Sequence, residues 1–319
     1  MIPALLKLIR WKNLLIIAFT QYCIRYLLIN GMLKFMNLGI ILQLSNFNFF
    51  LLSFSTLAIA AAGYIINDYF DTRIDTFNKP EQVVVGKSIS RRQAMLLHTI
   101  LNIVGVALGF YIAYRVGVIK LGFIHLLCTG LLWFYSTDFK KQLLIGNIVT
   151  SILTAMVPMI VVLYELPVLV VKYKTVLQYA GVNFNHILQF VAIYAGFAFL
   201  TSMIREIVKD MEDNLGDQQF GCNTLPIAFG MKAAKKVVIA LVIIEMILLM
   251  LVQIKQLASL DMTSFIYFAV CFQTGFTIFL FQFRKAQAPI QYHKASRTLK
   301  IIMLLGVMYT GLYYYLLLY

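Results

Sequence analysis

The chain has 319 residues, of which 61% are hydrophobic and only 13% are charged. Because soluble globular proteins carry about 25% charged residues, this composition excludes a soluble domain and indicates a membrane protein. The net charge of +14 does not indicate a nucleic-acid partner, since the basic residues are scattered among hydrophobic stretches and do not gather on one polar segment.

Several apolar stretches reach the roughly 20 residues that a helix needs to cross a bilayer, whereas the strands of a membrane barrel alternate over about 10 residues. The sequence therefore predicts an all-α, polytopic membrane protein. Nine transmembrane helices are expected at 14–32, 48–67, 94–113, 117–136, 143–164, 187–205, 235–254, 263–282 and 300–318. The segments between them are too short to bury a separate core, so residues 1–319 are expected to form a single domain.

The basic residues predict the orientation of the chain in the membrane. No small-residue cleavage site follows the first apolar stretch, which indicates an uncleaved first span. With nine spans, 20 of the 27 Lys and Arg residues fall on the side of the N-terminus. Since short loops rich in Lys and Arg stay in the cytoplasm, the N-terminus is expected inside, with cytoplasmic cap loops at about 68–93 and 206–234. In a bacterium this would be the inner membrane.

Nine of the 13 acidic residues fall in two short segments. The aspartates of the first segment, NDYFDTRID, are Asp68, Asp71 and Asp75, and those of the second, KDMEDNLGD, are Asp210, Asp213 and Asp217. In both segments the spacing is i, i+3 and i+7, which places the aspartates on one face of a helix. Three carboxylates on one face repel one another near the membrane boundary, so each stripe is expected to bind cations.

Magnesium is the cation that this pattern favours. It takes oxygen ligands and is commonly held by one or two carboxylates together with substrate phosphates. Calcium would favour an EF-hand-like run, and zinc would require His or Cys ligands, neither of which the sequence provides at suitable spacing. Two stripes that open on the same side of the membrane therefore suit a diphosphate bridged by magnesium ions.

Basic residues beside the stripes are typical of an anion site. Those after the first stripe are Arg73, Lys79, Lys87, Arg91 and Arg92, and those before the second are Arg205 and Lys209. The alternative is that loop charges are solvated and only set the topology. We favour this alternative for Arg92, Lys232, Lys235 and Lys236.

These motifs resemble those of the UbiA superfamily of membrane prenyltransferases. The family motif NDxxDxxxD matches Asn67 to Asp75, and DxxxD matches Asp213 to Asp217, with Asp210 extending it. The runs NKPEQVVVGKSIS and TLPIAFG also look like family stretches, and FYSTDFKKQLLIGN supplies a similar tyrosine and lysine at Tyr135 and Lys140. A different interpretation of the last pair is an interfacial tyrosine and a topology lysine.

The resemblance implies nine helices around a central cavity that opens to the cytoplasm, and a magnesium-dependent transfer of a prenyl group from an allylic diphosphate to a hydrophobic acceptor. The implied metal ligands are Asn67, Asp68, Asp71, Asp75, Asp210, Asp213 and Asp217. The implied catalytic residues are Asp71, Asp75, Asp213, Asp217, Tyr135 and Lys140. The implied diphosphate-binding residues are Asn67, Arg73, Lys79, Lys87, Arg91, Arg205 and Lys209.

One departure from the family pattern concerns the cation that contacts the diphosphate. Most members carry an arginine and a proline shortly after Pro80, where this chain has Gln82 and Val83. Lys79, Lys87 and Arg91 are the candidates to replace that arginine.

Among the branches of the superfamily, the first motif and its continuation look most like the digeranylgeranylglyceryl phosphate synthases, which implies a prenylated glycerol phosphate as acceptor. An aromatic acceptor of quinone synthesis is the alternative. A cation-coupled transporter that uses Glu245 is a third hypothesis, although transporter acids are expected nearer the middle of the membrane. The sequence fixes neither the prenyl chain length nor the oligomeric state.

The remaining polar residues within spans are expected to be structural. Arg25 and Glu245 are each expected to pair with a neighbouring helix, with a role in the acceptor site as the alternative. The four histidines, His98, His125, His186 and His293, show no ligand spacing. The cysteines, Cys23, Cys128, Cys222 and Cys271, lie far apart and are expected to be buried apolar fillers.

Overall fold

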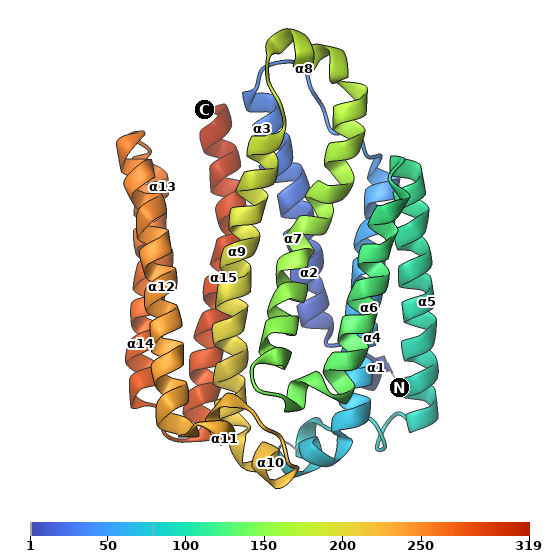
Figure 1. The fold of residues 1–319 in the computed structure, drawn as a ribbon, viewed down its shortest axis with the longest axis vertical. Coiled ribbons are helices and arrows are strands. Elements are labelled where there is room, and N and C mark those ends of the chain that lie inside the picture. Colours follow the sequence, from blue (N-terminus) through green and yellow to red (C-terminus); the bar gives the residue numbers. More distant parts are fainter. Residues whose placement is uncertain (1, 79) are drawn as a thin grey trace. The chain divides into compact units, whose positions relative to one another are not determined.

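The computed structural model describes residues 2–78 and 80–319, in which every regular element is a helix (Figure 1). The elements are α1 (Ile2–Leu8), α2 (Trp11–Cys23), η1 (Ile24–Ile29), α3 (Asn30–Phe35), α4 (Asn46–Asn78), η2 (Pro80–Gln82), α5 (Arg91–Val116), η3 (Ile119–Leu121), α6 (Gly122–Thr137), η4 (Phe139–Lys141), α7 (Ile145–Lys172), α8 (Lys174–Ala180), α9 (Asn185–Glu212), α10 (Asn214–Gln219), α11 (Leu225–Ala228), α12 (Gly230–Ala258), α13 (Met262–Tyr267), η5 (Phe268–Gln273), α14 (Thr274–Lys285) and α15 (Pro289–Leu318). The π-helical segments η1 and η5 join α2 to α3 and α13 to α14 without a break.

The predicted spans are confirmed. Within residues 2–78 and 80–319, nine helical segments are long and apolar enough to cross a membrane. Several run further than expected: α4 continues past residue 67 to Asn78, and α7 continues past residue 164 to Lys172. Hydropathy marks the apolar part of a helix. The polar turns after residue 67 do not end α4, and Glu165 and Pro167 do not end α7. The expected cap loops at 68–93 and 206–234 are therefore largely helical.

The chain divides into two compact units. Apart from the last two residues, unit 1 comprises the chain up to Phe139 together with Met156–Ile193, and unit 2 comprises Lys140–Ala155 together with Tyr194–Leu317. The helices α7 and α9 thus contribute one part to each unit.

In unit 1, α4 and α5 pack closely because small residues face each other. A Cβ atom on Gly105 would lie 2.6 Å from the side chain of Ile59, so only glycine fits there. At the same point the Ser55 hydroxyl donates to the carbonyl of Gly105 at 2.6 Å. Small residues and hydroxyls of this kind allow helices to approach closely in membranes. This packing fixes the helix that carries the first aspartates.

The end of unit 1 near the first aspartates has its own small core. Leu8 of α1, fully buried, packs with Ile65 of α4, with Val84, Val85 and Ile89 of the following loop, and with Ala94 of α5. The loop ends at Ser90, whose hydroxyl and backbone form a capping box with Gln93 at the start of α5. Residues 80–90 are therefore held by α1 and by the cap.

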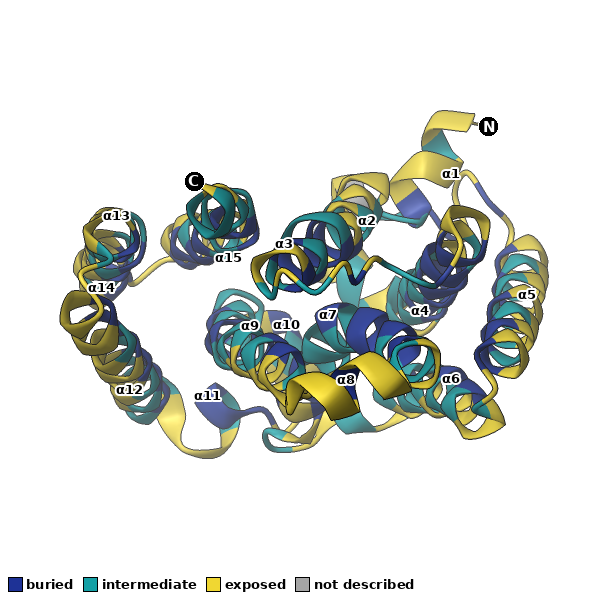
Figure 2. Ribbon diagram, turned by 90° about the horizontal axis from the view of Figure 1, so that it is seen from above, coloured by how far each residue is buried: buried dark blue, intermediate teal, exposed yellow. Residues whose placement is uncertain are grey.

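Helices in both units have a buried side and an exposed side, as Figure 2 shows for α5 and α12. On α5 the exposed residues Leu96, Ile100 and Ile103 follow helical spacing. Exposed apolar stripes on helices of this length are suited to contact with lipid. Of the four free cysteines, Cys23 and Cys222 are buried as expected, whereas Cys128 and Cys271 are partly exposed.

Candidate active site

The first carboxylate cluster comprises Asp68, Asp71 and Asp75, which lie in the last turns of α4. The helix is continuous from Asn46 to Asn78, so the predicted placement of the three aspartates on one helical face is confirmed. Their side chains are half-buried.

Arg10, one of the basic residues counted on the side of the N-terminus, lies against this cluster. Its Nη2 donates to Oδ1 of Asp68 at 2.8 Å, and its guanidinium lies 5.0 Å from the ring centre of Tyr64. Arg10 occupies a left-handed turn between α1 and α2, with φ 51° and ψ 52°. Burial lowers the pKa of Arg10, but the charge of Asp68, the hydrogen bond to it and the nearby Tyr64 and Tyr135 together raise the pKa above its ordinary value.

The basic residues that follow the first cluster contact the protein itself. The Lys87 amine donates to the carbonyl of Pro80 at 3.0 Å, and the Arg91 guanidinium lies 4.1 Å from the ring centre of Tyr69. Arg73 is exposed. Lys79, the remaining candidate of this group, lies outside the described residues.

The second carboxylate cluster comprises Asp210, Asp213 and Asp217, and its predicted helical face is wrong in one respect. The helix α9 ends at Glu212, Asp213 has φ −94° and ψ 5°, and α10 begins at Asn214. Asp and Asn side chains compete with the backbone for hydrogen bonds and so favour such breaks. The amide of Asp213 still donates to Lys209 and that of Asp217 to Asp213, which keeps the aspartates about one turn apart.

Asn147 positions the first aspartate of the second cluster. It is buried near the start of α7, and its Nδ2 donates to Oδ2 of Asp210 at 2.7 Å. The sequence analysis did not identify Asn147. The only signal for it was a lone amide near the start of an otherwise apolar span.

The basic residues before the second cluster bind a neighbouring acid in the same helix. Lys209 donates to both carboxylate oxygens of Glu206, at 2.9 and 3.0 Å, and Nη1 of Arg205 donates to one of them at 3.2 Å. The Nε of Arg205 is buried and has no hydrogen-bond partner among the described residues.

Each cluster also holds a buried amide oxygen that fits a magnesium ligand. Among residues 2–78 and 80–319, no three His, Cys, Asp or Glu side chains gather closely enough to hold a metal alone. However, Oδ1 of Asn67 and Oδ1 of Asn214 are buried and accept no hydrogen bond from any described residue. A neutral amide oxygen adds a ligand without adding repulsion, and magnesium takes its other ligands from water and phosphate. The residues present therefore fit magnesium, and Asn214 was missed by the sequence analysis.

Tyr135 and Lys140 lie at the end of α6 and in η4, both half-buried. Tyr135 is near enough to Arg10 to interact with its charge.

Arg25 and Glu245, the two charged residues predicted inside spans, each bond to a neighbouring helix, as predicted. Arg25 of η1 donates to Oε2 of Glu165 at 3.0 Å, and both residues are about 1% exposed. Oε1 of Glu165 accepts the amides of Gln43 and Leu44, which fastens the segment before α4. Glu245 of α12 is bonded to the Thr201 hydroxyl of α9 at 2.5 Å.

Comparisons with known proteins match most of the chain. The model of the UbiA prenyltransferase family matches residues 36–305. A digeranylgeranylglyceryl phosphate synthase of Methanosphaera stadtmanae is 31% identical over 264 residues, which cover 82% of this chain and 86% of that protein. The matched family region includes both carboxylate clusters.

Solved structures share the fold. A chain from work on digeranylgeranylglyceryl phosphate synthase in membranes has a TM-score of 0.61 at 24% identity, and the match covers 98% of this chain and 97% of that chain. A UbiA homologue of Archaeoglobus fulgidus bound to DMAPP and Mg²⁺ has a TM-score of 0.56 at 17% identity, with 96% and 98% covered.

Proposed function

This chain belongs to the UbiA prenyltransferase family, and from this premise we propose that it transfers a prenyl group, geranylgeranyl or similar, to the hydroxyl of a prenylated glycerol phosphate. The main support for this acceptor is the 31% identity to a digeranylgeranylglyceryl phosphate synthase over most of both chains. The donor would be an allylic diphosphate and the cofactor Mg²⁺. The UbiA homologue bound to DMAPP and Mg²⁺ supports both.

The proposal assigns the metal ions to the two carboxylate clusters. Their aspartates would be the charged ligands, and Asn67 and Asn214 would add neutral ones. Two features of the sequence support one shared diphosphate. Corresponding aspartates of the two clusters are separated by the same 142 positions, and each set follows an even-numbered span. The buried amide oxygens of the two asparagines, which accept no hydrogen bond from the described residues, support the ligand set independently.

The reaction breaks the bond between C1 of the prenyl group and the diphosphate oxygen and forms a bond from C1 to the acceptor hydroxyl oxygen. Bound magnesium would stabilise the charge that develops on the leaving diphosphate. The carboxylates would orient the diphosphate, and the hydroxyl proton would leave with the diphosphate or to water. Apolar helix faces would exclude water from the reacting carbon, so that the acceptor is attacked in preference to water.

Cationic side chains would bind the diphosphate oxygens directly. The candidates are Arg10, Arg73, Lys79, Lys87, Arg91, Lys140, Arg205 and Lys209, with Tyr135 as a hydrogen-bond donor. Arg10 supports this role best because it already lies beside a carboxylate of the first cluster. Lys87 and Arg91 would have to leave Pro80 and Tyr69 to reach a ligand. Arg10 is therefore our candidate for the arginine that is missing after Pro80.

We further propose that the site opens to the cytoplasm and that both units work as one domain. The excess of Lys and Arg on the side of the N-terminus supports this orientation. A cysteine introduced at exposed Arg73 should react with a membrane-impermeant maleimide only after the cytoplasmic face is opened, and labelling of intact cells would overturn the orientation.

The function is tested by identifying the product. Purified protein with magnesium and labelled geranylgeranyl diphosphate is offered a prenylglyceryl phosphate, 4-hydroxybenzoate and dihydroxynaphthoate side by side. We expect the labelled chain on the glycerol phosphate. Transfer to an aromatic acceptor alone would overturn the proposed acceptor. An absence of transfer to all three acceptors would overturn the proposed activity.

A further inference from the structure

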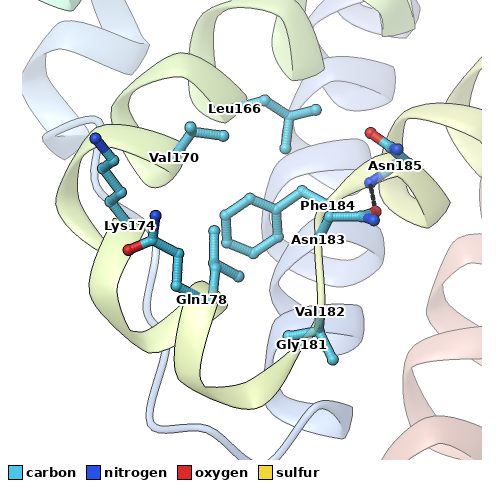
Figure 3. A pocket seen from close by; sticks show the side chains of 10 residues that line it. Leu166, Val170, Lys174, Gln178, Gly181, Val182, Asn183, Phe184 and Asn185 are labelled. Atoms are coloured by element: carbon cyan, nitrogen blue, oxygen red, sulfur yellow. Dashed lines mark hydrogen bonds between the residues drawn. The ribbon is translucent and has the colours of Figure 1, made fainter.

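Unit 1 contains a pocket of about 450 Å³ where α7, α8 and the start of α9 meet (Figure 3). This pocket lies far from the first carboxylate cluster. The segment that precedes α4 is bonded to the same end of α7, since the amide of Ile41 donates to the Tyr173 hydroxyl at 3.2 Å. The pocket is thus near the N-terminal end of α4, whereas the aspartates occupy its C-terminal end.

The walls of the pocket are apolar. Leu166 and Val170 from α7 line one side, and Phe184 from the loop before α9 lines another. Leu177 from α8 also lines the pocket. Phe184 is 3% exposed, so this part of the pocket wall is a side chain packed in the protein. These side chains would accept a hydrocarbon chain and provide no polar partner for it.

The rim of the pocket is polar and carries one cation. Lys174 and Gln178 are one helical turn apart on α8, and Asn183 and Asn185 come from the loop and the start of α9. Oδ1 of Asn183 accepts the amide of Asn185 at 2.9 Å, which leaves its Nδ2 available (Figure 3). The amides and the amine are therefore placed together as hydrogen-bond donors.

Lys174 has no counter-ion in the part of the chain that the structure describes. Its amine makes no ion pair or hydrogen bond with any residue in the described ranges 2–78 and 80–319. The sequence has no Asp or Glu between Leu166 and Arg205, and the nearest acid of α7, Glu165, is already paired with Arg25. An exposed lysine over apolar walls attracts an anion that has a hydrocarbon portion.

The position of the pocket corresponds to a membrane surface. The candidate span of α7 ends at Lys172 and that of α9 begins at Asn185, so α8 connects two spans. Tyr179 of α8 is 90% exposed, as is typical of tyrosines at the level of lipid headgroups.

We propose that this pocket binds an anionic phospholipid of the leaflet opposite the first carboxylate cluster. The phosphate would lie against Lys174 and Gln178, and the first part of an acyl chain would lie along Leu166 and Val170. The unpaired cation selects the phosphate, and the apolar walls select a lipid over a free anion. This site is separate from the proposed reaction.

The test compares two neighbouring lysines in the full chain purified in a neutral detergent. Lys172→Gln is the matched control, because Lys172 is exposed in the same hairpin but does not line the pocket. Phosphatidylglycerol should raise the thermal unfolding temperature of the wild type at lower concentration than phosphatidylcholine does. Lys174→Gln should raise the half-saturating phosphatidylglycerol concentration about fivefold, and Lys172→Gln should not change it.

Two further measurements test whether the positive charge and the acyl chain are both needed for the stabilisation. Lys174→Arg should retain the wild-type half-saturation, and glycerol 3-phosphate, which has no acyl chain, should not stabilise the protein. Equal losses in Lys174→Gln and Lys172→Gln would show diffuse attraction to the surface and would overturn the proposal. Stabilisation by glycerol 3-phosphate equal to that by the lipid would overturn the lipid as the ligand.

Discussion

The two carboxylate clusters have the same spacing in sequence but are held differently. The first lies on a continuous helix, and the cation Arg10 contacts Asp68 from another part of the chain. The second is broken at Asp213, and the neutral amide of Asn147 contacts Asp210. Arg10 thus neutralises part of the charge of the first cluster, whereas Asn147 orients a carboxylate of the second without changing its charge.

This difference predicts opposite responses to magnesium. A cation beside a carboxylate competes with a metal ion for that carboxylate, whereas an amide that donates to one oxygen orients the other oxygen for the metal. Loss of Arg10 should therefore strengthen magnesium binding, and loss of Asn147 should weaken it.

Removal of one aspartate from either cluster should abolish the reaction. Asp71→Ala and Asp213→Ala should each lower the rate of prenyl transfer at least about a thousandfold, since metal and diphosphate would lose a charged ligand. Asp138→Asn, which changes an exposed aspartate outside the clusters, serves as the control. Near-normal turnover in either alanine variant would show that only one cluster serves the reaction.

A carboxylate that is already paired with a cation of the chain should affect stability and not magnesium binding, unlike the aspartates of both clusters. Glu165 is paired with Arg25, so Glu165→Ala should lower the free energy of unfolding by about 3–5 kcal/mol, because a buried guanidinium loses its partner. The magnesium concentration that the Glu165→Ala variant needs for activity should not change. Unfolding in denaturant checks the first effect, and the double variant Arg25→Met, Glu165→Leu should recover part of the loss. Unaltered unfolding of Glu165→Ala would contradict the pairing.

Asn147→Ala should raise the half-saturating magnesium concentration about 10- to 100-fold, the range usual for residues that orient metal ligands. The measurement is the thermal stabilisation of the protein by magnesium without substrate. Thr154→Val, two turns further along α7 and bonded to Ser202, is a matched control. If both variants shift magnesium binding alike, the effect comes from helix packing and not from Asp210.

Arg10→Gln should lower the half-saturating magnesium concentration about fivefold in the same assay, as expected for a partly exposed ion pair worth about 1 kcal/mol. Lys12→Gln, a nearby change of equal charge, should have less effect. A weaker affinity for magnesium in Arg10→Gln would contradict the contrast between the clusters.

The sequence predicted those features that depend on local periodicity. Hydropathy found the nine spans of the described chain, and the spacing of Asp68, Asp71 and Asp75 was correct because α4 is continuous. The break at Asp213 was missed because the same spacing persists across two helices. The expected single domain and the meeting of both clusters at one diphosphate stay predictions.

Contacts between distant parts of the chain could not be predicted in this way. Arg10 and Asp68 are 58 residues apart, and Asn147 and Asp210 are 63 residues apart. Nothing in the local pattern distinguishes Arg10 from a topology cation, or Asn147 from a residue that merely begins a helix. The roles of Arg25 and Glu245 were easier to anticipate, because a charge inside a span must find a partner.

Binding of an unreactive donor tests directly whether both clusters hold one diphosphate through magnesium. Calorimetry with geranylgeranyl thiolodiphosphate should show binding to the wild type only when magnesium is present. Asp71→Ala and Asp213→Ala should both lose this magnesium-dependent binding. Wild-type affinity in either variant, or equal binding without magnesium, would contradict it.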